Sequence, residues 1–232
     1  MQNIIQKTME DYNRIAKYFS DSRYDTWSEL EQFKKYVKDG QNILDWGCGN
    51  GRLLFLFKGE KIKYFGIDNS IELLKIARKK FGKEVKEGRA KFYCTAKKAK
   101  KFPDGFFDLV FMIASLHHLP DEKTRLELLE KTYREMKEGA MLIITVWNLK
   151  SDWATEKIKK DWKIIGENDF LIPWKDEKSR VLVERDYHDF SEGELIDLLK
   201  KAGFKIIKLD FYSKSNWTDK KGGRNLIAIV KK

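Results

Sequence analysis

Three glycines at alternate positions form the most chemically informative stretch of the chain. Residues 43–52 read Ile-Leu-Asp-Trp-Gly-Cys-Gly-Asn-Gly-Arg, in which an apolar run ends at Asp45 and a glycine-rich turn follows. Glycines remove side chains where a ligand must approach the backbone, and a helix that begins after such a turn points its N–H groups at the ligand. The stretch therefore predicts a strand, a ligand-binding turn containing Gly47, Gly49 and Gly51, and a helix start.

The spacing excludes two common nucleotide sites. The dinucleotide fingerprint G-x-G-x-x-G needs a glycine where this chain has Arg52, and a phosphate-binding loop needs Gly-Lys-Ser/Thr, a run that the chain lacks. A second acid points to a ligand with a ribose. Tyr64 to Asp68 reads as a short buried strand that ends in a carboxylate, roughly 20 residues past the loop. We expect Asp68 to accept hydrogen bonds from ribose hydroxyls.

The composition is that of a globular protein with excess positive charge. Its 232 residues suit one α/β domain, and 47 Lys and Arg against 36 Asp and Glu leave a net charge of +11, which favours a polyanion such as nucleic acid. Two cysteines are too few for a disulfide framework or a structural zinc site. No signal peptide and no membrane-spanning apolar run is visible. We expect a soluble, cytoplasmic protein with no metal and no membrane contact.

Apolar periodicity places the other elements. It predicts helices over residues 2–19, 28–38, 53–58, 71–81, 124–136 and 191–201, and strands over 90–94, 107–113, 140–146, 204–211 and 225–230. Ser70 and Ser191 precede two of these helices as capping residues. The alternation predicts a mostly parallel sheet whose ligands bind beyond the carboxyl ends of the strands. Residues 147–190 show no clear strand–helix rhythm.

The Asp-x-Gly-x-Gly-x-Gly pattern resembles motif I of the class I S-adenosylmethionine (SAM) methyltransferases. The resemblance implies a Rossmann-like α/β fold: a mostly parallel seven-stranded sheet with a C-terminal antiparallel hairpin and helices on both faces. It also implies SAM as cofactor and S-adenosylhomocysteine as product. The positions that match the family's cofactor site are Asp45, Gly47, Cys48, Gly49, Asn50, Gly51, Asp68, Asn69, Thr95, Ala96 and Ile113. Thr95 stands where the family usually has an acid near the adenine.

Residues 113–118, Ile-Ala-Ser-Leu-His-His, follow the predicted fourth strand, where the methyl group meets its acceptor in this fold. The chain has no Pro-Pro run of the kind found there in enzymes that methylate base amino groups. Neither Cys48 nor Cys94 is placed to attack a pyrimidine ring. An oxygen acceptor is therefore favoured, and a carboxylate acceptor needs no general base because it is ionised at pH 7.

Several stretches resemble the tRNA wobble-uridine carboxymethyl methyltransferases, which esterify 5-carboxymethyluridine in the anticodon. The matches are spread from residue 12 to residue 195, so they do not depend on the glycine turn alone. The matching stretches are Tyr12-x-x-Ile15-Ala16-x-x-Phe19-Ser20-x-x-Arg23-Tyr24-x-x-Trp27, residues 113–119, Val146-Trp147, Ile172-Pro173-Trp174 and Arg185-x-Tyr187-His188-x-Phe190-x-Glu192-Gly193-Glu194-Leu195.

Carried over by position, this resemblance implies an acceptor site. Arg23 and Tyr24 would bind the substrate, and a guanidinium makes chemical sense there because it can hold a carboxylate or phosphate bidentately. His117 or His118 would orient the acceptor, and the sequence leaves open which of them faces the cavity. The catalytic candidates are thus His117, His118 and Arg23. The candidates for stacking on a splayed-out base are Trp147, Trp174, Tyr187 and His188.

The resemblance also implies an organisation and a set of partners. We expect a single methyltransferase domain over residues 1–232, with an N-terminal helical extension over 1–40 and a substrate-recognition insertion over 147–190. The expected partners are tRNA, through its anticodon loop, and a small zinc-binding activator protein; apart from these we expect a monomer.

Two other functions stay open. A small-molecule O-methyltransferase of the same fold would bind SAM without salt-dependent tRNA affinity. A non-catalytic RNA-binding module of the same fold is disfavoured by the intact glycine turn and by Asp68.

Overall fold

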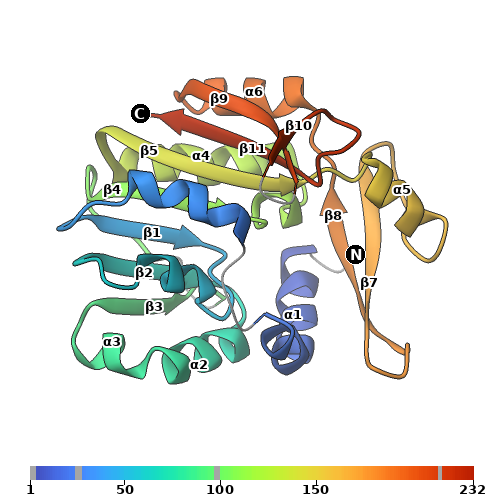
Figure 1. Ribbon diagram of the computed structural model, residues 1–232, viewed down its shortest axis with the longest axis horizontal. Coiled ribbons are helices and arrows are strands. Elements are labelled where there is room, and N and C mark those ends of the chain that lie inside the picture. Colours follow the sequence, from blue (N-terminus) through green and yellow to red (C-terminus); the bar gives the residue numbers. More distant parts are fainter. Residues whose placement is uncertain (1–3, 24–27, 97–99, 214–215) are drawn as a thin grey trace.

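Five parallel strands form the middle and one edge of the main sheet. The computed structural model describes residues 4–23, 28–96, 100–213 and 216–232. The sheet has the order β10-β9-β11-β5-β4-β1-β2-β3, in which β11 pairs antiparallel with both β5 and β9 (Figure 1). Its strands are β1 (Asn42–Trp46), β2 (Lys63–Asp68), β3 (Ala90–Cys94), β4 (Phe107–Ile113), β5 (Met136–Trp147), β9 (Lys205–Ser213), β10 (Asn216–Thr218) and β11 (Asn225–Lys231).

This arrangement confirms the predicted Rossmann-like fold. The antiparallel pair β9 and β11 is the expected C-terminal hairpin, and the short edge strand β10 adds an eighth strand to the expected seven. The central strands are buried on both faces, which is why they read in the sequence as continuous apolar runs.

Helices cover both faces of the sheet, as expected. One face packs against α4 (Glu122–Glu135) and α6 (Glu192–Lys201), and the opposite face against α2 (Ile71–Lys80) and two 3₁₀ helices, η1 (Ser28–Tyr36) and η2 (Arg52–Phe57). The predictions over 28–38 and 53–58 were therefore right in place but not in helix type. The hydroxyls of Ser70 and Ser191 accept the predicted capping hydrogen bonds, from the N–H groups of Leu73 and Glu194.

The stretch 147–190 folds into a short helix and a separate three-stranded antiparallel sheet. Its elements are α5 (Asp152–Ile158), β6 (Lys163–Ile164), β7 (Asp169–Lys175) and β8 (Val181–His188). Strands β7 and β8 alternate buried with more exposed positions and carry several charged residues, unlike the apolar runs of the main sheet. A small core of its own, built on Leu149, Phe170, Ile172 and Tyr187, packs the sheet together.

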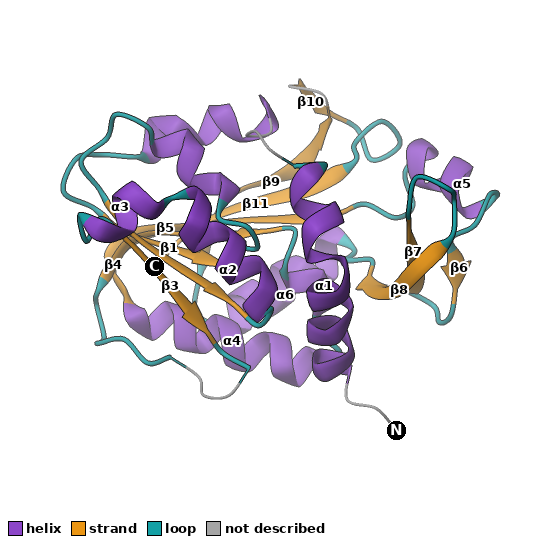
Figure 2. Cartoon of the chain, turned by 90° about the horizontal axis from the view of Figure 1, so that it is seen from below, coloured by secondary structure: helices purple, strands orange, loops and turns teal. Residues whose placement is uncertain are grey.

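The N-terminal helix α1 (Ile4–Asp21) lies between α2 and the β7/β8 hairpin in both views (Figures 1 and 2). On one side, Asn13 Oδ1 accepts hydrogen bonds from the Ser70 hydroxyl, at 2.8 Å, and from the N–H of Glu72. On the other side, the Lys7 ammonium pairs with the Asp186 carboxylate of β8 at 2.8 Å. The helix thus joins the main sheet to the insertion. Among the described residues, no helix combines the length and apolarity needed to cross a bilayer.

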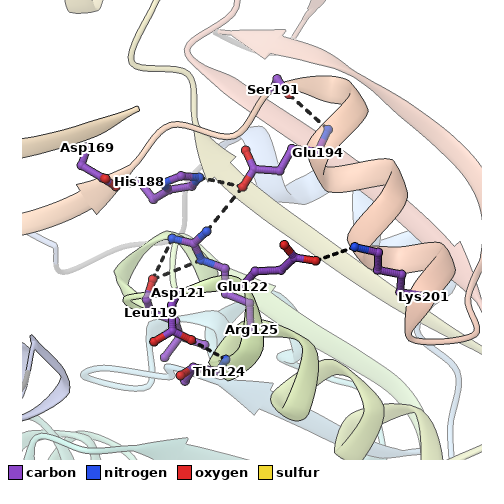
Figure 3. A network of polar contacts seen from close by, with 10 residues as sticks. All are labelled: Leu119, Asp121, Glu122, Thr124, Arg125, Asp169, His188, Ser191, Glu194 and Lys201. Carbon is purple, nitrogen blue, oxygen red and sulfur yellow. Dashed lines mark hydrogen bonds and ion pairs between the residues drawn. The ribbon is translucent and has the colours of Figure 1, made fainter. Parts of the chain in front are cut away.

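A polar latch ties the insertion to the helices of the main sheet (Figure 3). We use this name for Asp169, His188, Glu194 and Arg125. The two ring nitrogens of His188 lie 2.8 Å from Asp169 Oδ1 and 2.7 Å from Glu194 Oε1, while Arg125 contacts the same Glu194 oxygen at 3.4 Å and donates two hydrogen bonds to the carbonyl of Leu119. The latch therefore joins β7, β8, α4 and α6 to the loop that follows the paired histidines.

Replacing Gly203 with Ala is expected to destabilise the fold by about 1–2 kcal/mol. Gly203 follows α6 with φ +97°, and an added Cβ would lie 3.2 Å from the Tyr133 ring. Gly193→Ala is the matched control, because this glycine lies inside the same helix with nothing within 4 Å of an added Cβ. Urea unfolding should show a loss for the first variant and no loss for the second. Equal stabilities would contradict the strain at Gly203.

The latch should stabilise the fold less as the pH rises. Burial alone would lower the pKa of His188, but hydrogen bonds to Glu194 and Asp169 outweigh it and raise the pKa above its ordinary 6.5. The stabilisation is therefore complete below pH 6.5 and is lost as the pH rises through the folded-state pKa. Comparing urea unfolding of the wild type and His188→Gln across this range isolates the contribution. Parallel stability curves for the two proteins would contradict it.

Candidate active site

A cavity of about 740 Å³ opens at the carboxyl ends of the parallel strands. Its walls come from the glycine turn after β1, the loops after β2, β3 and β4, helix α1 and strand β8. This volume is within the range of small-molecule sites in proteins. Charged side chains line it: the carboxylates of Asp45 and Asp68 and the guanidiniums of Arg23, Arg52 and Arg185.

The glycine turn is held in a conformation that few other residues can adopt. Gly47, Gly49 and Gly51 have φ values of +73°, +53° and +74°. An added Cβ at Gly47 would lie only 2.5 Å from the Cβ of Ser115, which belongs to the loop after β4. Ala114, next to that serine, is itself left-handed with φ +50°. The missing side chain of Gly47 thus leaves room for the Ser115 side chain where the two loops line the cavity.

Asp68 fixes the turn from the end of the neighbouring strand. Its carboxylate accepts a hydrogen bond from the N–H of Gly49 at 2.8 Å and another from the N–H of Ser70, also at 2.8 Å. Burial raises the pKa of Asp68, and these backbone donors oppose the shift. Each carboxylate oxygen has a further lone pair, so the group can still accept hydrogen bonds from a ligand in the cavity.

Asp45 is buried at the end of β1, with 2% of its surface exposed, and its carboxylate accepts a 2.6 Å hydrogen bond from the Tyr64 hydroxyl on β2. Burial raises its pKa to about 7, against the lowering effect of the Tyr64 bond. A cation that entered beside Asp45 would favour the ionised form. Asp45 and Asp68 therefore offer an acceptor for an ammonium and an acceptor for hydroxyls in one cavity.

The structure brings nearly all of the predicted cofactor residues to this cavity. Those that line it are Asp45, Gly47, Cys48, Gly49, Asn50, Asp68, Asn69, Thr95, Ala96 and Ile113. Gly51 does not line it, because it faces the protein interior: an added Cβ there would lie 3.0 Å from the Phe92 ring. The role of Gly51 is to leave room for that packing.

His118 lines the cavity, and both of its ring nitrogens are engaged. Nδ1 lies 2.9 Å from the carbonyl oxygen of Asp186, which only accepts, so Nδ1 carries the proton. Nε2, 2.9 Å from the Tyr12 hydroxyl, is then the acceptor of that O–H. Burial lowers the pKa of His118 to about 3. The imidazole is neutral and fixed, which suits it for holding Tyr12 in place rather than for removing a proton.

His117 does not line the cavity. It is 2% exposed, accepts a 3.2 Å hydrogen bond from the N–H of Trp147 at Nδ1, and leaves Nε2 without a partner. Its ring lies 4.7 Å, centroid to centroid, from the ring of Tyr187. Of the two histidines that the sequence left undecided, His118 faces the cavity and His117 supports the wall behind it.

Arg23 also lines the cavity, next to the glycine turn: its carbonyl oxygen accepts a 3.2 Å hydrogen bond from the Asn50 amide. The guanidinium carbon lies 4.3 Å from the centre of the Phe19 ring and 4.8 Å from that of Trp174. Trp174, predicted to stack on a base, is not part of the cavity wall and instead supports this arginine. Tyr24 lies outside the described residues.

The aromatic candidates from the insertion divide into two groups. Trp147 and Tyr187 line the cavity and stack on each other with centroids 4.9 Å apart and an interplanar angle of 25°. His188, predicted to bind the substrate, lies outside the cavity because Asp169 and Glu194 hold its two nitrogens in the latch (Figure 3).

Two lining residues were not singled out from the sequence. Tyr12 donates to His118, and Arg185 donates through Nη1 to the hydroxyls of Tyr187, at 2.7 Å, and of Tyr12, at 3.3 Å. Both residues lie in the stretches that resemble the tRNA methyltransferases. The sequence does not show that they line one cavity together, because Tyr12 and Arg185 are 173 residues apart.

Comparisons with known proteins agree with this geometry. A family model described as a methyltransferase domain matches residues 43–139. A tRNA (carboxymethyluridine(34)-5-O)-methyltransferase from Schizosaccharomyces pombe is 27% identical over 89% of this chain and 91% of its own length. A Xenopus tropicalis protein of the same name is 26% identical over 89% of this chain, which spans only 39% of that longer protein.

Solved structures share the fold. A SAM-dependent methyltransferase from Clostridium acetobutylicum superposes with a TM-score of 0.67 at 16% identity, covering 95% of this chain and 98% of that one. A methyltransferase solved in complex with a methyltransferase activator of Haloferax volcanii gives a TM-score of 0.65 at 17% identity, covering 95% and 96%. With the glycine turn, the two acids and the cavity at the strand ends, the methyltransferase-domain match and the S. pombe relative identify the chain as a SAM-dependent methyltransferase.

Proposed function

We propose that this enzyme methylates the carboxylate of a 5-carboxymethyluridine at the wobble position of tRNA. The observation that carries the proposal is a cavity that continues from the cofactor residues into a wall containing Arg23, Trp147 and Tyr187. A guanidinium suits an anionic acceptor, and flanking aromatic rings suit a base removed from its stack. The names of the S. pombe and Xenopus relatives support the same substrate.

In the proposed complex, the residues around the glycine turn hold SAM. Asp45 would pair with its ammonium, Asp68 would accept from its ribose hydroxyls, and Thr95 and Ala96 would lie beside its adenine. Bound SAM supplies a sulfonium methyl group, which a carboxylate oxygen can accept without losing a proton. The chain's part is then to align the acceptor and to exclude water. A neutral His118 with both nitrogens engaged agrees with a reaction that needs no base.

We further propose that the chain forms a single domain whose N-terminal extension, residues 1–40, and insertion, residues 147–190, recognise the substrate. Both contribute to the acceptor side of the cavity, through Tyr12 and Arg23 in one case and Arg185 and Tyr187 in the other. The net charge of +11 supports binding of a polyanion such as tRNA, and we propose that the enzyme binds the anticodon loop and acts in the cytoplasm. The fold neighbour solved with a methyltransferase activator supports an activator protein as partner, and we propose that this partner is small and binds zinc.

The direct test is transfer of labelled methyl from SAM to tRNA that carries 5-carboxymethyluridine, followed by nucleoside mass spectrometry. We expect a methylated uridine whose label is released by mild base, as an ester requires. Asp68→Ala is expected to abolish both transfer and SAM binding. No incorporation by SAM-bound wild type, with the activator added, would contradict the tRNA substrate and favour a small acid as acceptor.

SAM binding should weaken below about pH 7. Asp45 has a pKa of about 7 in the free protein, and only its ionised form attracts the ammonium, so affinity should fall about tenfold per pH unit below that value. Tyr64→Phe removes a hydrogen bond that lowers this pKa, and should move the transition to higher pH. Tyr133→Phe, whose ring packs on Phe204, is the control. Calorimetric titration between about pH 5.5 and 7.5 measures the transition, and identical profiles for the three proteins would contradict the role of Tyr64.

A further inference from the structure

Arg185 is a buried cation in the wall of the cavity. It projects from β8, is 4% exposed, and lines the cavity beside Tyr12 and Tyr187. Nη1 donates to the two tyrosine hydroxyls, and Nε has no hydrogen-bond partner. Neutral hydroxyls fix the orientation of the guanidinium but do not balance its charge.

The nearby carboxylates form their ion pairs with another cation. Asp11 and Asp186 each pair with the Lys7 ammonium at 2.8 Å, and Asp11 attracts Arg185 without pairing with it directly. Within the described ranges, neither Arg185 nor Arg23 forms an ion pair with a carboxylate. A buried charge without a partner is costly unless a ligand of opposite charge completes the site.

Arg23 is the second guanidinium of the same wall. The Trp174 ring contacts both guanidiniums: its centroid is 4.8 Å from the guanidinium carbon of Arg23 and 5.1 Å from that of Arg185. Burial, and then repulsion from Arg185, act to lower the pKa of Arg23. An anion bound against both guanidiniums would relieve this repulsion.

We propose that Arg185, together with Arg23, binds the carboxylate of the acceptor and makes the enzyme select an acid over the corresponding neutral amide. The inference rests on the proposed function and adds a specificity-determining residue to it. A guanidinium has only donors and a carboxylate only acceptors, so the two match completely. An amide has no negative charge and only one acceptor oxygen, so its NH2 group would face one of the two guanidiniums. A carboxylate oxygen that accepts one hydrogen bond keeps a further lone pair for the methyl group.

The proposal is tested by binding of two nucleosides to the protein saturated with S-adenosylhomocysteine. Calorimetry should show that wild type binds 5-carboxymethyluridine about 10- to 100-fold more tightly than 5-carbamoylmethyluridine, as expected for hydrogen bonds to a charged group. Arg185→Gln should lose most of this preference while keeping its SAM affinity. Arg180→Gln, the same change at an exposed arginine that pairs with Asp176, should keep the preference.

Further variants keep the test independent of folding. Tyr187→Phe removes the 2.7 Å hydrogen bond that orients Arg185, and should reduce the preference for the acid. Arg185→Lys keeps the positive charge but loses the planar set of N–H donors that can bind both carboxylate oxygens, and should give an intermediate preference for the acid. Thermal unfolding of each variant shows whether the fold is intact. Unchanged discrimination in folded Arg185→Gln or in Tyr187→Phe would overturn the proposal, as would equal binding of acid and amide by wild type.

A backbone phosphate of tRNA could present similar anionic chemistry, and a third measurement separates it from the acceptor carboxylate. Arg185→Gln should weaken binding of tRNA that carries 5-carboxymethyluridine more than binding of the same tRNA with an unmodified uridine. An equal loss for both would assign Arg185 to a phosphate and overturn the proposal. If wild type binds the acid nucleoside selectively but methylates no tRNA, the role given to Arg185 stands and the proposed tRNA substrate is wrong.

Discussion

The carboxylate of Asp68 is the point from which the cofactor side of the cavity is arranged. It closes the glycine turn through Gly49 and begins α2 through Ser70, and the hydroxyl of that serine is in turn bonded to Asn13 of α1. One side chain thus helps to set the relative positions of the turn after β1, the end of β2 and two helices. Backbone N–H donors offset the cost of partly burying its charge. The turn is also held to β2 by the N–H groups of Gly47 and Cys48, which donate to the carbonyl of Ile67, but Asp68 supplies its only side-chain acceptor among the described hydrogen bonds.

Helix α1 gives the cavity its second half. The same helix bonds to α2 through Asn13, to His118 through Tyr12 and to β8 through Lys7. The extension and the insertion are therefore not independent additions to the methyltransferase fold. They meet through α1 and through Arg23, which packs on Trp174, so the acceptor wall needs both in place. The latch at His188, two residues beyond Asp186 on β8, holds the insertion to α4 and α6 as well.

The sequence predicts well the features that depend on residues close together in the chain. Buried parallel strands, the glycine turn and the serine caps depend on neighbouring residues, and all are found where expected. The strands of the insertion are not visible in the sequence, because β7 and β8 are half-exposed and lack the continuous apolar runs of the main sheet. Trp174 and His188 lie outside the cavity wall, and the sequence does not indicate this because their partners, Arg23 and Glu194, are set by the tertiary fold. The unbalanced charge of Arg185 could not be read either, because a missing partner is a property of three-dimensional surroundings.

The two guanidiniums of the cavity wall have a consequence for turnover. On the proposed reaction, esterification removes the negative charge of the acceptor, and the sulfonium loses its positive charge in the same step. The cavity, whose acceptor wall holds Arg23 and Arg185 without a carboxylate partner among the described residues, then surrounds a neutral ester. The attraction that recruits the acid is absent from the product. Product inhibition by the ester should be weak, because methylation itself removes the charge that held the acceptor in the cavity.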